Sequence, residues 1–273
     1  MNNILEQCGD LLIKVREKQP LIHHITNYVT MNDCANVVLA IGGSPIMAMD
    51  KNEVEEIVSC SSALVINMGT LNENNVHSMV IAGKKANEIG IPVILDPVGV
   101  GATNFRRQTV RKLLDSVQFA IIKGNMSEIK TLAGVNVTSK GVDSNTDDIG
   151  KELIARNLAN ELNTTIVITG KDDIVSRGKE VVVIHNGPEL LTKVTGTGCM
   201  TTSLIGAFAS VADDFTIGGI AGVMLMGIAG ELAYKMLLKD ENVGSFRVKL
   251  MDCIAEFNEQ TYIDNGNYVI AEK

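Results

Sequence analysis

Short apolar runs that alternate with longer helical patterns constrain the fold of this chain more than any other feature. Six such runs are present: IHHIT, PIMAM, ALVINMG, PVILDPVG, FAIIKGN and TIVITG. Strands alternating with helices indicate βαβ units and a mainly parallel sheet. The runs are continuously apolar, which is typical of strands that helices cover on both faces. We therefore predict a three-layer α/β/α sandwich around a mainly parallel central sheet.

The remaining elements follow from the same reading. Helical patterns cover Ile4–Lys18, Met31–Ile41, Asn52–Ser59, Glu73–Ile89, Arg106–Leu114, Ser127–Leu132, Thr146–Leu162, Cys199–Val211, Thr216–Leu238 and Ser245–Phe257. The stretch DDIVSRGKEVVVIHNG predicts a hairpin appended to the parallel strands. With no linker, repeat or low-complexity tract in 273 residues, we expect one domain over residues 1–273.

Composition narrows the class of partner. The chain has 24 Lys and Arg against 32 Asp and Glu, a net charge of −8, and no basic run, so it is not expected to bind nucleic acid or an anionic membrane. Its five cysteines are far apart and form no C-x-x-C pair, which argues against a disulfide framework and a zinc site. The N-terminus has helical spacing and no signal-peptide pattern. We expect a cytoplasmic protein with a small-molecule partner.

One apolar segment needs its own interpretation. The stretch from Ile217 to Gly230 is shorter than the ~20 residues of a membrane span and continues into Glu231 within one helical pattern. It predicts a buried core or interface helix.

Polar residues follow most of the expected strands. They are Asn27, Asn67, Gly69, Asp96, Lys123, Gly124, Asn125, Thr169 and Gly170. Because parallel strands end at the same edge of a sheet, these residues should meet in one crevice, where ligands of such sheets bind.

The stretch VTGTGC leads into the helical pattern that starts near Cys199. Its two glycines, Gly196 and Gly198, could form an anion-binding nest before a helix whose N-terminus favours negative charge. Taken alone, the same glycines could equally serve only close helix packing. The chain has no G-x-x-x-x-G-K-[ST] motif, and this G-x-G does not open the first βαβ unit as a Rossmann motif would.

Asn125 and Glu128 form N-x-x-E at the start of a helix. A carboxylate there is favoured by the helix dipole and could hold hydrated Mg²⁺, although the spacing is equally that of a capping box. Asp96 is a second strand-end carboxylate directed at the same crevice.

Six ordered motifs together resemble a known family. HHITNYVTMNDCAN, GGSPIMAM, DPVGVGAT, KGNMSEI, VITGKDD and VTGTGCM, from Leu21 to about Phe208, are similar to hydroxyethylthiazole kinases of thiamine salvage, in the branch of the ribokinase-like superfamily without a lid domain. The resemblance implies ATP-dependent phosphorylation of the hydroxyl of 4-methyl-5-(2-hydroxyethyl)thiazole, with Mg²⁺, by a homotrimer with sites at subunit interfaces.

The resemblance also implies roles for individual residues. The thiazole would contact Asn27, Met47 and Gly196; ATP would contact Lys123, Asn125 and Thr169; Asp96 and Glu128 would serve the metal. Met47 suits its role because a flexible thioether adapts to a sulfur heteroaromatic ring. The family pattern favours arginine at position 123, and lysine keeps the charge without the planar bidentate fork.

Cys199 occupies the position where most of the superfamily has an aspartate as base. Phosphoryl transfer passes through a loose transition state, in which positioning and charge neutralisation do most of the work. We expect the N–H groups from Gly196 through Thr197 and Gly198 to Cys199 to stabilise the transferring phosphoryl group, with the Cys199 thiol mainly positioning the alcohol.

Two alternatives stay open. The chain could phosphorylate another small alcohol, such as hydroxymethylpyrimidine or pyridoxal. It could also be a non-catalytic thiazole-binding relative, although the metal and transfer motifs together argue against a mere binder.

Overall fold

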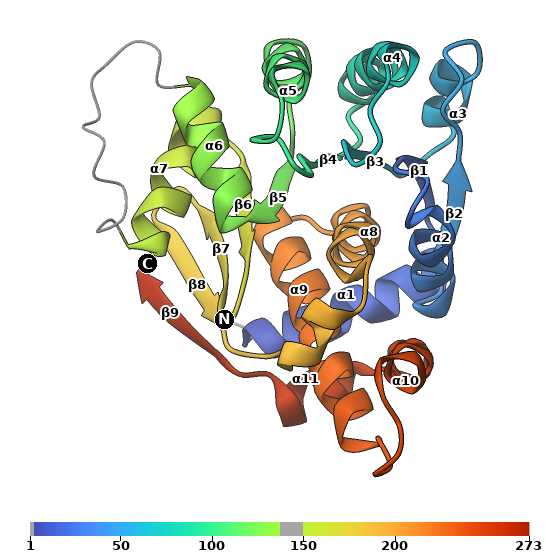
Figure 1. The fold of residues 1–273 in the computed structure, drawn as a ribbon, viewed down its shortest axis with the longest axis vertical. Helices are drawn as coiled ribbons and strands as arrows, with labels where there is room; N and C mark the ends of the chain where they lie inside the picture. The colour runs from blue at the N-terminus through green and yellow to red at the C-terminus, as the bar shows by residue number, and fades with distance from the viewer. Residues whose placement is uncertain (1–2, 137–149, 273) are drawn as a thin grey trace.

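The central sheet has nine strands and helices on both faces (Figure 1). The computed structural model describes residues 3–136 and 150–272. The strand order is β2-β1-β3-β4-β5-β6-β7-β8-β9, in which β1 to β6 pair in parallel and β6 to β9 pair antiparallel. The strands are β1 (Leu21–Ile25), β2 (Ser44–Met47), β3 (Ala63–Asn67), β4 (Val93–Asp96), β5 (Ile121–Asn125), β6 (Thr165–Thr169), β7 (Asp173–Arg177), β8 (Glu180–Ile184) and β9 (Tyr268–Glu272).

The helices form the outer layers. On one side lie α1 (Ile4–Lys18), α2 (Met31–Ala40), α8 (Thr197–Ala209), α9 (Phe215–Lys235), α10 (Val243–Glu256) and α11 (Glu259–Asn265). The other side carries α3 (Val54–Ser59), α4 (Glu73–Ile89), α5 (Asn104–Ser116), α6 (Met126–Asn136) and α7 (Lys151–Leu162). A short 3₁₀ helix, Glu189–Lys193, precedes α8. The predicted three-layer sandwich is confirmed, and no separate lid domain is present among the described residues.

Each sheet face packs into its own hydrophobic core, as the continuously apolar strands require. Along β3, Val65 faces the layer that contains α8, whereas Leu64 and Ile66 face the opposite layer. Each such fully buried aliphatic side chain contributes ~1.5–3 kcal/mol to stability. Gly206 allows α8 to approach the sheet closely, because a Cβ there would lie 2.6 Å from a methyl group of Val65.

The six parallel strands and the hairpin, β7 with β8, are confirmed. The last strand β9 and the helix α11 were not predicted; β9 pairs antiparallel with β8 and closes that end of the sheet (Figure 1). Of the helix expected over Thr146–Leu162, positions 146–149 lie outside the described residues and the rest forms α7.

The apolar helix α9 is a core helix, as predicted. It is long and apolar enough to cross a membrane, but 78% of its most apolar window is buried inside the fold. Its glycines let neighbouring backbone approach, since a Cβ at Gly227 would lie 2.8 Å from the carbonyl oxygen of Asn186.

Candidate active site

The strand order places a crevice above β1 and β3. The chain passes from β1 outward to β2 and then returns to β3 on the other side of β1, which makes this pair the topological switch point. Ligands of open α/β sheets bind outside the carboxyl ends of strands at such a point. Helix α8 packs against β3 and β4 and begins at this end of the sheet.

Asn67, the last residue of β3, lies at the centre of a buried hydrogen-bond network. Its Nδ2 donates to Asp96 Oδ2 over 2.9 Å and to Cys199 Sγ over 3.3 Å. Its Oδ1 accepts from Gly69 N and from Asn27 Nδ2, each over 2.9 Å. The backbone donor at Gly69 fixes which end of this amide is the oxygen.

Asn27 completes the same network. Its Oδ1 accepts from the backbone N–H groups of Val29 and Thr30, each over 3.1 Å. Its Nδ2 therefore faces Asn67 and donates also to Cys199 Sγ over 3.4 Å. The sulfur of Cys199, partly exposed at the crevice, thus accepts two amide N–H groups.

Asp96 and Lys123 form a buried ion pair one and two strands farther along the sheet. Lys123 Nζ lies 3.6 Å from Asp96 Oδ2 and donates to the carbonyl oxygen of Gly198 over 3.1 Å. Thr202 Oγ1 donates to the same carboxylate oxygen over 2.7 Å. Burial raises the pKa of the Asp96 carboxyl, and the nearby positive charge of Lys123 offsets only part of that rise. Burial would lower the pKa of Lys123, but the charge of Asp96 and other acidic groups leaves it raised, so the ammonium stays protonated.

Glu128 and Asn125 make the reciprocal capping box that their spacing allows. Glu128 N donates to Asn125 Oδ1 over 2.9 Å, and Asn125 N donates to Glu128 Oε2 over 2.8 Å. Glu128 Oε1 accepts from Gly99 N over 2.9 Å, so this carboxylate also joins the loop after β4 to α6. Glu128 therefore has a structural role whatever else it binds.

The start of α8 differs from the expected two-glycine nest. Gly196 has a left-handed φ of +93°, whereas Gly198 lies within the helix. The Thr197 hydroxyl donates to the carbonyl oxygens of Leu191 and Val194, so only its backbone N–H is available for catalysis. The first N–H groups of α8 have no intrahelical acceptors and face the crevice end of the sheet. The expected anion-binding nest is replaced by a helix N-terminus preceded by one left-handed glycine, Gly196.

A cavity of about 810 Å³ adjoins α8 on the side of β5 and β6. Asn125, Thr169 and Gly198 line one part of it, and Leu191 and Met226 line an apolar part. Asp173 also lines it and accepts from Gly170 N over 2.7 Å, which shapes the turn after β6. Burial raises the pKa of Asp173 to about 7.

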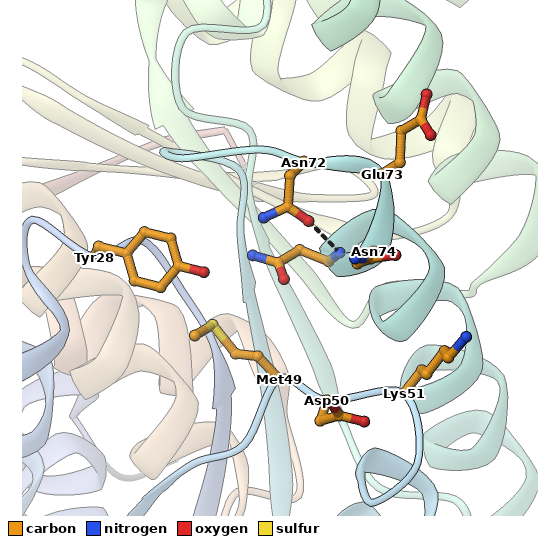
Figure 2. Close-up of a pocket in the computed structure, with 8 residues that line it drawn as sticks. Tyr28, Met49, Asp50, Lys51, Asn72, Glu73 and Asn74 are labelled. Carbon is orange, nitrogen blue, oxygen red and sulfur yellow. Dashed lines mark hydrogen bonds between the residues drawn. The ribbon is translucent and has the colours of Figure 1, made fainter.

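A second cavity, of about 690 Å³, lies on the side of β2 and α4. Figure 2 shows the Tyr28 ring and the Met49 thioether on one side of it, facing Asn72 at the start of α4. The dashed line marks the bond from Asn75 N to the N-cap oxygen of Asn72. Met47 ends β2 beside His24 and is absent from the residues lining either cavity, whereas Met49 is among them.

The adjacent histidines of β1 and the five cysteines differ in their surroundings. His23 and His24 have different partners, Ala48 O and Ser203 Oγ, because neighbouring residues of a strand point to opposite faces. All five cysteines are free; Cys34 and Cys253 are buried, and Cys60 is exposed. Cys60 follows α3 at its C-terminal end, where the helix faces solvent.

Comparison with known proteins gives one consistent answer. Residues 12–260 match the model of the hydroxyethylthiazole kinase family. The chain belongs to this family. It is 55% identical over 258 residues to a hydroxyethylthiazole kinase of Alkaliphilus oremlandii, covering 94% of this chain and 95% of that protein. The predicted family and the kinase activity in thiamine salvage are confirmed.

Solved structures support the fold of this family member. A hydroxyethylthiazole kinase of Pyrococcus horikoshii superposes with a TM-score of 0.87 at 39% identity, over 97% of this chain and 99% of that one. A ribokinase-like superfamily protein of Enterococcus faecalis superposes with a TM-score of 0.63 at 10% identity, over 92% and 95%, and shows the shared fold alone. The predicted ribokinase-like fold is confirmed.

Two residues that link the side chains of the site by hydrogen bonds, Asn67 and Thr202, were not predicted as site residues from the sequence. Asn67 was noted only as a strand-end residue, yet it contacts Asn27, Asp96 and Cys199. Thr202, one turn into α8, caps the Asp96 carboxylate. The position of Thr202, three residues after Cys199 in a helical pattern, could have indicated its place in the site, because that spacing puts both side chains on one helix face.

Proposed function

We propose that the chain transfers the γ-phosphoryl group of Mg·ATP to the hydroxyl of 4-methyl-5-(2-hydroxyethyl)thiazole. The observation that carries this proposal is the contact between Asn27 and Cys199, two residues whose chain neighbours line two different cavities. Tyr28, next to Asn27, lines one cavity, and Gly198, next to Cys199, lines the other. An acceptor and a donor bound in these cavities would meet at the start of α8.

The cavity beside β5 and β6 suits a nucleotide. Its apolar part, at Leu191 and Met226, suits a base, and its polar part near the N-terminus of α8 suits phosphates. Asn125 and Thr169 line the cavity and would contact ATP there. Lys123, buried beside Gly198, would supply positive charge to the phosphoryl group.

The donor set fits Mg²⁺. The second oxygen of the Asp96 carboxylate, Oδ1, is buried and has no hydrogen-bond partner among the described residues. Mg²⁺ keeps several waters and usually takes one or two carboxylates with substrate phosphates, so Asp96 and Glu128 would hold it without a larger cluster. Bound Mg²⁺ would neutralise charge on the phosphates during transfer.

The cavity of Figure 2 suits the acceptor. Met49 and Tyr28 offer a thioether and an aromatic ring to a small heteroaromatic alcohol, and Tyr28 is next in the chain to Asn27. Asn27, Met47 and Gly196 are further proposed contacts of the thiazole. Tyr28 and Val29 are exposed by 61% and 66%, and a homotrimer that covers them would complete the site at a subunit interface.

The proposed role of Cys199 follows from the contacts of its sulfur. Because its sulfur already accepts N–H groups from Asn27 and Asn67, the thiol hydrogen is left to point toward the acceptor hydroxyl. Cys199 then orients the alcohol, and the N–H groups of Thr197, Gly198 and Cys199 stabilise charge on the transferring phosphoryl group. We also propose that the protein is cytoplasmic and that residues 1–273 form a single domain.

A substrate panel tests the acceptor. With Mg·ATP, kcat/KM should be highest for hydroxyethylthiazole among that alcohol, hydroxymethylpyrimidine and pyridoxal. Preference for either of the other two would replace the proposed substrate. Tight thiazole binding without turnover of any alcohol would indicate the non-catalytic alternative.

A further inference from the structure

Arg106, in the first turn of α5, points its guanidinium group at three backbone carbonyl oxygens. Nη1 donates to Met68 O and, over 2.6 Å, to Val98 O, and Nη2 donates to Gly69 O over 2.6 Å. In the part of the chain that the structure describes, these three carbonyl oxygens are the hydrogen-bond acceptors of the Arg106 guanidinium. The side chain lines neither of the two cavities assigned above to substrates.

The three carbonyls belong to two loops that carry site residues. Met68 and Gly69 directly follow Asn67 at the end of β3, and Val98 is two residues beyond Asp96 at the end of β4. Asn67 and Asp96 are register partners in the sheet, and Met68 N donates to Asp96 O over 3.0 Å. Arg106 therefore ties together the two loops just beyond the point where sheet pairing ends.

The Gly69 loop in turn positions Asn27. A Cβ added at Gly69 would lie 2.6 Å from the Cβ of Asn27, so the two residues are in close contact. The Gly69 N–H also donates to the Asn67 side chain, whose amide contacts Cys199. A displacement of Gly69 would reach Cys199 through both amides that donate to its sulfur.

Only a guanidinium group can make this set of bonds. It presents five N–H donors in a rigid fork, whereas a lysine ammonium is a point charge that cannot span two loops in the same geometry. Charged donors to carbonyl oxygens also make stronger hydrogen bonds than neutral ones.

We propose that Arg106 is a positioning residue for phosphoryl transfer, which holds Asn67 and Asn27 against Cys199 without touching either substrate. This inference rests on the proposed function. Because a misplacement of ~1 Å at a reacting centre can cost about 100-fold in rate, Arg106→Ala should lower kcat by about that factor. The KM for ATP should stay within about threefold, since Arg106 is absent from the cavity assigned to the nucleotide.

The test compares Arg106→Ala, Arg106→Lys and the control Arg107→Ala. Arg107 is the next residue of α5, and its guanidinium contacts Gly101 O and Asn104, at the α5 end of the loop after β4, instead of the carbonyl oxygens of Met68, Gly69 and Val98. Guanidinium ion at low millimolar concentration should restore part of the kcat of Arg106→Ala, urea at the same concentration should not, and Arg107→Ala should resemble wild type. Thermal unfolding of each variant is recorded in parallel.

The outcomes distinguish a failure of the inference about Arg106 from a failure of the proposed function. Arg106→Ala with near wild-type kcat, a loss of nucleotide affinity equal to the loss of kcat, or the absence of rescue by guanidinium would each overturn the inference. If wild type itself fails to phosphorylate the thiazole, the proposed function is wrong, and the rate of Cys199 alkylation decides the inference. Arg106→Ala should change that rate at Cys199 but not at the exposed Cys60, and an unchanged rate would overturn it.

Discussion

The side-chain amide of Asn67 donates a hydrogen bond to the sulfur of Cys199, with Nδ2 and Sγ 3.3 Å apart. The same nitrogen donates to Asp96, so one amide joins the expected metal-side carboxylate to the residue that replaces the usual base. With Asn27 as second donor, the acceptor capacity of the sulfur is largely occupied before any substrate arrives.

Replacing Cys199 by alanine should leave substantial activity. If the thiol mainly orients the alcohol, kcat should fall by no more than about 100-fold, the scale of a single general acid–base contribution. Steady-state kcat measures this, with Cys60→Ala as a control at an exposed cysteine. A loss of several thousand-fold would show that the thiol is an essential base.

Replacing Asn67 by alanine should lower both stability and kcat. The change removes donors to Asp96 and Cys199 and an acceptor for Asn27, and a buried polar group left without its partner costs ~1–3 kcal/mol. Denaturant unfolding and kcat test this prediction. Wild-type stability and rate in Asn67→Ala would exclude the network as a determinant of either.

Neighbouring aspartates should give opposite pH dependences of stability. The pKa of Asp173 is raised to about 7, so the folded state binds a proton more tightly and stability falls as pH rises toward 7. Asp173→Asn should remove this loss, so its melting temperature relative to wild type should be higher at pH 8 than at pH 5. Equal differences at both pH values would contradict the prediction.

Asp172 is the matched control. Its hydrogen bond with His185 lowers the pKa of the Asp172 carboxyl, so its stabilisation is present at neutral pH and is lost as pH falls through that lowered pKa. Asp172→Asn should therefore reduce the melting temperature more at pH 7 than in acid.

Glu231 should matter to nucleotide affinity although it is outside the cavity lining. Its Oε1 accepts from Gly187 N over 2.8 Å, and Gly187, with Asn186, lines the proposed nucleotide cavity. Losing a hydrogen bond to a charged group costs ~1.5–3 kcal/mol of stability, so Glu231→Ala should loosen the Gly187 wall of the cavity and raise the KM for ATP. Glu231→Gln keeps an acceptor and should stay close to wild type. A rise in the KM for thiazole instead would contradict this assignment.

The sequence was sufficient for elements whose signal is local. The apolar runs gave β1 to β6, and Asn125 with Glu128 gave a real capping box because both members lie within one helical turn. β9 was not predicted, because its strand character depends on pairing with β8, which lies more than 80 positions earlier in the chain.

The connections within the site also required the structure. Arg106 and Asn67 are 39 positions apart, and the packing of α5 against α4 and α6 brings the Arg106 guanidinium to the loop that follows Asn67. Gly198 shared a motif with Gly196, yet the helix begins between them, and helix boundaries depend on tertiary packing as well as on local pattern.

The most direct test of the central claim is product analysis after incubating the purified chain with Mg·ATP and 4-methyl-5-(2-hydroxyethyl)thiazole. The account predicts the phosphate monoester of the thiazole alcohol by mass spectrometry, with one ADP formed for each ester. ADP without the ester, or no reaction while another small alcohol is phosphorylated, would contradict it.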